Sequence, residues 1–99
     1  MLKRDEVIEK IREHRDEICA LGAASLFLYG SIARDEATEE SDIDVFIDKL
    51  PGHRLTFREY TGIIHLLEDT FDRAVDVGTR ESLHPALQSE IIASAIKVF

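Results

Sequence analysis

Cysteine is almost absent from this 99-residue sequence, with Cys19 as its single representative. One thiol excludes an internal disulfide and a zinc site built from several cysteines. Long apolar runs are missing too, since those present, such as residues 26–29, fall far below the roughly 20 residues of a membrane-spanning helix. The first residues turn acidic before any apolar segment, so no secretory signal is predicted. We therefore expect a soluble, cytoplasmic domain that does not bind membranes.

Basic side chains are outnumbered, with 12 lysines and arginines against 20 aspartates and glutamates, and the formal net charge is -8. Residues 35–48 contain seven acids and no base. A field of this sign repels a phosphate backbone, so direct binding of nucleic acid is not expected. Glu39 and Glu40 fit a solvated loop. The alternating pair Asp42 and Asp44 needs a separate explanation.

A chain of this length can bury one core but not two, so residues 1–99 are predicted to form a single domain. The apolar spacing over residues 5–21 predicts one helix, which Gly22 ends. Residues 26–29 form a continuous apolar run, typical of a strand buried on both faces. A second strand is predicted over residues 43–47.

The next helix has a clear start signal. Thr56 and Glu59 have the spacing of a capping box, in which each side chain binds the backbone N–H of the other. Apolar residues then recur every three or four positions from Phe57 to Phe71. A helix is therefore predicted here, with Phe57 on its buried side.

The last part of the sequence predicts one more strand and one more helix. Residues 73–78 are the strand candidate. Pro85 fits the first turn of a final helix, whose apolar positions would be Leu87, Ile91, Ala95 and Ile96. This order predicts an α/β (α+β) fold, in which a short mixed sheet packs against about four helices.

Gly30 and Ser31 follow the first predicted strand and begin a short helical turn. Glycine lets a ligand approach the backbone, and the serine hydroxyl adds a hydrogen-bond donor, so the pair could hold a phosphate. Arg34 lies within one helical turn, where its guanidinium could bind a second phosphate oxygen. Taken alone, Gly-Ser at a strand end is more often an ordinary helix cap.

Asp42 and Asp44 are two residues apart, so in a strand they would project from the same face. Their charges repel, and a divalent cation relieves that repulsion. Oxygen ligands of this kind favour Mg²⁺, with Mn²⁺ as the alternative. A calcium loop of the EF-hand type does not fit, because Phe46 and Ile47 replace its third ligand and its glycine.

Asp76 is a third candidate, in the middle of an apolar strand where an unpaired acid is costly. If the two strands are neighbours, it can lie beside Asp42 and Asp44. The alternative is that Asp76 ends a strand or faces water. Two other side chains stay open: Tyr29 could pack or border a pocket, and His84 could be structural or line a site.

Gly-Ser, a gap of ten residues, Asp-x-Asp and a third acid on a later strand resemble the minimal nucleotidyltransferases of the DNA polymerase beta superfamily. The sequences Gly-Ser-Ile-Ala-Arg and Ser-Asp-Ile-Asp-Val carry the same resemblance. It covers nearly the whole chain, because such proteins are little more than a palm-like catalytic domain. The residues to which the resemblance assigns roles are the catalytic, metal-binding acids Asp42, Asp44 and Asp76 and the nucleotide-binding residues Gly30, Ser31 and Arg34.

The resemblance implies a Mg²⁺-dependent enzyme that uses ATP as its nucleoside triphosphate. Minimal members are commonly antitoxins that form a hetero-oligomer with a HEPN-domain ribonuclease toxin. Their proposed activity is transfer of AMP to a tyrosine of that toxin, which silences it. The short chain leaves no room for an acceptor-binding domain, which fits a protein substrate that arrives as a bound partner.

Two other functions stay open on the sequence. One is a non-catalytic antitoxin that neutralises its partner by contact, although such a protein needs no paired carboxylates. The other is a transferase for a small molecule such as an aminoglycoside, although the chain has no length left for an acceptor pocket.

Overall fold

The computed structural model describes residues 2–99. Its centre is a four-stranded mixed sheet with the strand order β3-β2-β1-β4. The strands are β1 (Ala23–Tyr29), β2 (Ile43–Lys49), β3 (Val75–Thr79) and β4 (Ile96–Lys97). Strand β1 runs antiparallel to both β2 and β4, whereas β2 and β3 are parallel. The predicted α/β class with a short mixed sheet is confirmed.

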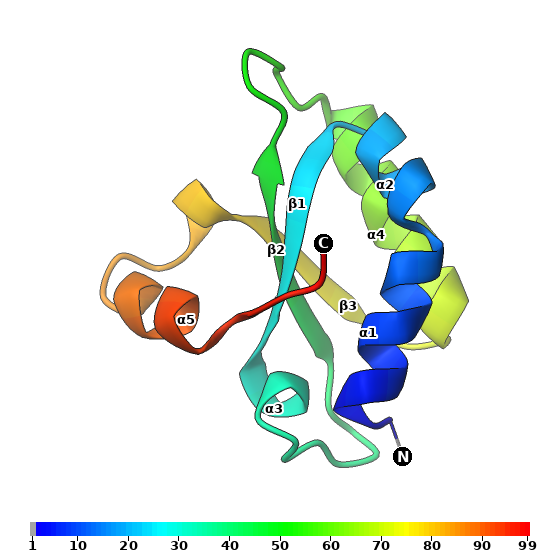
Figure 1. Cartoon of the computed structure of the whole chain (residues 1–99), viewed down its shortest axis with the longest axis vertical. Coiled ribbons are helices and arrows are strands. Elements are labelled where there is room, and N and C mark those ends of the chain that lie inside the picture. The colour runs from blue at the N-terminus through cyan, green and yellow to red at the C-terminus, as the bar shows by residue number, and fades with distance from the viewer. Residues whose placement is uncertain (1) are drawn as a thin grey trace.

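Five α-helices surround the sheet within residues 2–99, rather than about four. They are α1 (Arg4–Glu13), α2 (Arg15–Ala20), α3 (Gly30–Ala33), α4 (Phe57–Phe71) and α5 (Gln88–Ser94), and a 3₁₀ turn, η1 (Arg80–Ser82), follows β3. Helices α1, α2 and α4 lie together on one side of the sheet, and α5 lies on the other (Figure 1). No helix in the described chain is both long and apolar enough to cross a membrane.

The main core lies between the sheet and helices α1, α2 and α4. Leu26 and Leu28 of β1 and Val45 of β2 are completely buried there, against Ile11 of α1 and Leu67 of α4. Each such side chain contributes about 1.5–3 kcal/mol relative to an exposed one. This packing holds the three longer strands in fixed register.

The single helix predicted over residues 5–21 is wrong, because the chain breaks into α1 and α2 at His14. Val7, Ile11 and Ile18 of the predicted stripe are fully buried. The His14 ring does not continue that stripe but binds Glu17, with its Nδ1 3.1 Å from Oε1. The helix is thus interrupted at His14, the one position of the predicted stripe that has no apolar side chain.

The prediction that residues 26–29 are buried on both faces is also wrong. Along β1, buried Leu26 and Leu28 alternate with half-buried Phe27 and Tyr29. The second pair faces the side of the sheet that only the C-terminal segment covers. This less covered face is where the candidate site lies.

Helix α4 begins as the sequence predicts. The Glu59 N–H donates to Thr56 Oγ1 at 3.1 Å, and the Thr56 N–H donates to Glu59 Oε1 at 3.0 Å, which completes the capping box. Phe57 was expected on the buried side but is 82% exposed. The helix meets the core only from Tyr60 onward, and Ile63 is fully buried instead.

The final helix begins at Gln88 after a turn, not at Pro85, and ends at Ser94. The residues after it turn back to the sheet, where Ile96 pairs with Leu28 of β1. A strand of two residues has no readable periodicity, so β4 was missed. Pairing with β1 wins over continuing the helix because it satisfies backbone groups at the sheet edge.

A second, smaller layer holds the C-terminal segment on the open face of the sheet. Phe27 and Phe46 stack with ring centroids 4.8 Å apart, and the Arg80 guanidinium lies over both rings. Arg80 also donates two hydrogen bonds to Asp48, at 2.8 and 3.0 Å. Its carbonyl accepts a hydrogen bond from the Gln88 side chain at 2.9 Å, which ties α5 to this layer.

Candidate active site

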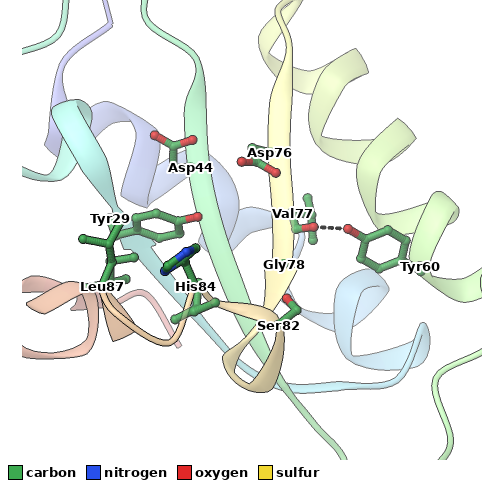
Figure 2. A pocket seen from close by; sticks show the side chains of 11 residues that line it. Tyr29, Asp44, Tyr60, Asp76, Val77, Gly78, Ser82, His84 and Leu87 are labelled. Atoms are coloured by element: carbon green, nitrogen blue, oxygen red, sulfur yellow. Dashed lines mark hydrogen bonds between the residues drawn. The ribbon is translucent and has the colours of Figure 1, made fainter. Parts of the chain in front are cut away.

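Tyr29, Asp44 and Asp76 form a row across three strands. Tyr29 of β1 is the register partner of Asp44 of β2, and Asp44 is the register partner of Asp76 of β3. Register partners project from the same face of a sheet, so the phenol and both carboxylates lie together (Figure 2). The strands that carry Asp44 and Asp76 are neighbours, which is the condition under which Asp76 can lie beside Asp44. Asp76 itself is exposed on the open face and not buried among apolar side chains.

Asp42 lies just before β2 and not within it, because the strand begins at Ile43. Two contacts hold this segment against the start of β3. The Ile43 N–H donates to the Ala74 carbonyl at 3.3 Å, and Arg73 Nη1 donates to the Ser41 carbonyl at 2.8 Å. Asp42 is exposed at the edge of the row.

Gly30 makes the turn from β1 into α3 with a φ of +76°, a conformation that side chains strongly disfavour. A Cβ atom here would collide with the Asp44 carboxylate. The carboxylate therefore lies directly over the Gly30 backbone, where only glycine leaves room for it. The close approach predicted for a ligand at this glycine is made by Asp44 in this structure.

Ser31 and Arg34 lie on the four-residue helix α3 and at its end. The Ser31 carbonyl accepts the Glu36 N–H at 2.8 Å, and Arg34 Nε donates to Glu36 Oε2 at 3.1 Å. The Arg34 side chain is 54% exposed in this pair. Burial and the neighbouring carboxylates raise the pKa of Asp44, and the Arg34 charge opposes this rise only in part.

The surroundings of Asp44 disfavour its charged form. Burial raises its pKa most, the charge of Asp76 raises it further, and that of Asp42 adds a smaller contribution. Burial, followed by the charges of Asp76 and Asp44, raises the pKa of Tyr29 to about 12. The row thus holds a protonated phenol beside two repelling carboxylates.

Two neighbouring cavities open on this face, of about 450 and 470 Å³. Asp44 and Asp76 line the first, together with His84. Gly30 and Arg34 line the second. Both cavities share three lining residues, which are Tyr29, Leu87 and Ile91. The predicted site residues therefore divide between adjacent cavities, and Ser31 and Asp42 are in the lining of neither.

Sequence reasoning left Tyr29 and His84 open and read Leu87 and Ile91 only as helix packing positions. All four line the candidate site. The position of Tyr29 directly before Gly30 was a usable signal, and it proves to be a wall of the cavity. Leu87, just before α5, and Ile91, within it, gave no such signal, because a helix stripe looks the same over a core or over a cavity.

The carboxylate oxygens of the row are suitable ligands for a hard divalent cation, but they are too few to complete its coordination. Within residues 2–99, no three His, Cys, Asp or Glu side chains are grouped closely enough to hold a metal ion by themselves. Mg²⁺ is commonly bound by one or two carboxylates together with water and substrate phosphates. The paired carboxylates of Asp44 and Asp76 match that incomplete donor set.

Comparison with known proteins assigns the chain to a family. The family model of the nucleotidyltransferase domain matches residues 11–98. Two proteins of Methanocaldococcus jannaschii are similar in sequence. "Putative protein adenylyltransferase MJ1379" is 36% identical over 80 residues, which are 80% of each chain. "Putative protein adenylyltransferase MJ0435" is 34% identical over 77 residues, which are 78% of this chain and 81% of that protein.

Solved structures have the same fold. One, described as a "putative minimal nucleotidyltransferase", superposes with a TM-score of 0.69 at 28% identity and covers 90% of this chain and 93% of its own. A toxin–antitoxin crystallised with AMP-PNP also gives a TM-score of 0.69, at 17% identity, over 99% of this chain and 73% of its own. The chain belongs to the nucleotidyltransferase domain family, as a minimal nucleotidyltransferase.

Proposed function

We propose that this protein is an antitoxin that binds a HEPN-type toxin and transfers AMP from ATP to the hydroxyl group of a tyrosine on that toxin. The observation that carries the proposal is the register pairing of Asp44 with Asp76 beside the Gly30 turn. A stability role does not explain two repelling carboxylates at adjacent positions. A site for a polyphosphate and its cation does.

Asp42, Asp44 and Asp76 would hold Mg²⁺, or Mn²⁺ in its place, together with phosphate oxygens of the nucleotide. When bound, the cation supplies charge neutralisation for the triphosphate and the departing pyrophosphate. Transfer of a phosphoryl or nucleotidyl group needs mainly positioning and such electrostatic support.

The remaining residues bind and orient the reactants. The Ser31 hydroxyl would donate a hydrogen bond to a phosphate oxygen. The Arg34 guanidinium would do the same after it releases its hydrogen bond to Glu36. The acceptor oxygen attacks the α-phosphorus. The bond between the α-phosphorus and the oxygen that bridges to the β-phosphate breaks, and pyrophosphate leaves. Asp76, the more exposed carboxylate of the pair, would accept the proton of the attacking hydroxyl.

A protein acceptor is supported by the names of the two archaeal relatives, which describe protein adenylyltransferases. The open face of the sheet also fits a large acceptor, because the cavity beside Asp76 opens to the surface next to the exposed Leu87. The partner would supply the groups that surround its own hydroxyl.

Position-specific labelling of ATP tests this reaction. The protein is incubated with a candidate HEPN-type partner, Mg²⁺ and ATP labelled at the α- or the γ-phosphate. Label from the α-phosphate should enter the partner chain, whereas label from the γ-phosphate should leave with pyrophosphate. Transfer of the γ-label would instead indicate a kinase and contradict the proposal.

Matched variants complete the test. Asp42→Asn should abolish incorporation of the α-label, whereas Glu39→Gln, which removes an exposed charge from the same acidic stretch, should not. Full activity of Asp42→Asn would show that this acid is not part of the site. A tight complex without any incorporation would favour neutralisation by contact alone.

A further inference from the structure

His84 lines the cavity of the two carboxylates, yet the reaction described above gives it no task. It precedes Pro85 in the segment between η1 and α5. In the view of Figure 2, the Asp44 and Asp76 carboxylates lie above the rings of Tyr29 and His84.

A backbone contact fixes the His84 ring. The Ala86 N–H donates to His84 Nδ1 at 3.1 Å. A nitrogen that accepts a hydrogen bond carries no proton, so in the neutral ring the proton is on Nε2. No hydrogen bond to another described residue occupies that second nitrogen. His84 therefore offers one oriented N–H donor at the cavity.

The cavity has few side-chain hydrogen-bond donors for an anionic ligand. Its lining contains two carboxylates and no lysine or arginine. The two guanidinium groups nearby have partners elsewhere, since Arg80 binds Asp48 and Arg34 binds Glu36. A triphosphate that enters beside Asp44 and Asp76 meets two side-chain donors that are already in position, the Tyr29 phenol and the His84 ring.

We propose that His84 binds the nucleotide by donating a hydrogen bond from Nε2 to a phosphate oxygen. This inference rests on the proposed function, because it takes a nucleoside triphosphate as the ligand of the site. His84 is then a binding residue for the phosphates and plays no part in the proton transfer assigned to Asp76.

His84→Asn separates this role from a structural one. An asparagine oxygen accepts the N–H two residues further on, as in an Asx turn, so this variant keeps the contact with Ala86. It removes the donor at the Nε2 position. His65→Asn is the control, because His65 is exposed on α4 and lines neither cavity of the site.

Two measurements on the full chain test the proposal. Calorimetric titration with AMP-PNP and Mg²⁺ should show a roughly tenfold weaker affinity for His84→Asn, and wild-type affinity for His65→Asn. The thermal midpoints of the proteins should agree. In long-range proton–nitrogen spectra, the His84 Nε2 resonance should shift on addition of AMP-PNP and stay in place on addition of adenosine.

Equal affinities of wild type and His84→Asn, or an equal response of Nε2 to adenosine, would overturn the inference. The proposed function would survive that result if wild-type protein still transferred AMP. Failure of wild-type protein both to bind AMP-PNP and to transfer AMP would overturn the function and the inference together. The two failures are therefore distinguishable.

Discussion

Replacing Gly30 by alanine probes the contact on which the geometry of the site depends. Alanine at position 30 would have to adopt a φ of +76°, and its Cβ atom would collide with the Asp44 carboxylate. The backbone strain costs about 1–2 kcal/mol, and relief of the collision costs about 1–3 kcal/mol more. We expect Gly30→Ala to lower the free energy of unfolding by about 2–5 kcal/mol and to abolish AMP transfer.

Gly52 provides a matched control for the strain. Its φ is +74°, and a Cβ built there has no atom within 4 Å. Gly52→Ala should therefore cost only the strain, about 1–2 kcal/mol, and leave transfer intact. The difference between the two variants in urea denaturation measures the collision with Asp44.

A double variant identifies the colliding group. If the Asp44 carboxylate is responsible, Gly30→Ala should cost less in an Asp44→Ala background, with a coupling of about 0.5–3 kcal/mol. Equal costs of Gly30→Ala and Gly52→Ala, or a coupling of zero, would refute the placement of the carboxylate over the glycine.

Two further predictions concern charges on the open face. Burial and the charge of Asp76 raise the pKa of Asp44, so the folded state binds this proton more tightly than the unfolded state does. Ionisation of Asp44 should therefore reduce stability as the pH rises above about 4, the ordinary pKa of an aspartate, so Asp44→Asn should be more stable than wild type without metal. Denaturation of both proteins in chelator at several pH values checks that this difference grows as Asp44 ionises. Arg80→Ala removes two hydrogen bonds to Asp48 and the cover of Phe27, which should cost about 1–2 kcal/mol in the same assay.

Local signals in the sequence predicted the elements that carry the site. The capping box at Thr56 depends only on residues three positions apart, and it forms as expected. The Gly30 turn likewise depends on its own backbone conformation. The sequence placed Asp44 and Asp76 on two short strands but left open whether these strands are neighbours, and the structure pairs them in parallel.

The features that were missed depend on contacts between distant segments. Ile96 pairs with Leu28, a partner far along the chain, and no pattern in the last residues announces it. Phe57 has the right spacing for the buried side of α4, but the helix extends past the core at that end. The Gln88 side chain ties α5 to the Arg80 carbonyl eight residues earlier, and no periodic pattern in the sequence indicates that contact.

The most direct test of the central claim is the intact mass of the partner chain. The protein and its partner are incubated with ATP and Mg²⁺, and the masses are compared with those obtained using Asp44→Asn and Asp76→Asn. The account predicts a partner that is heavier by whole AMP units with wild-type protein and unchanged with both variants. An unchanged partner that is nevertheless bound and silenced by wild-type protein would contradict catalysis, and so would a full mass increase with either variant.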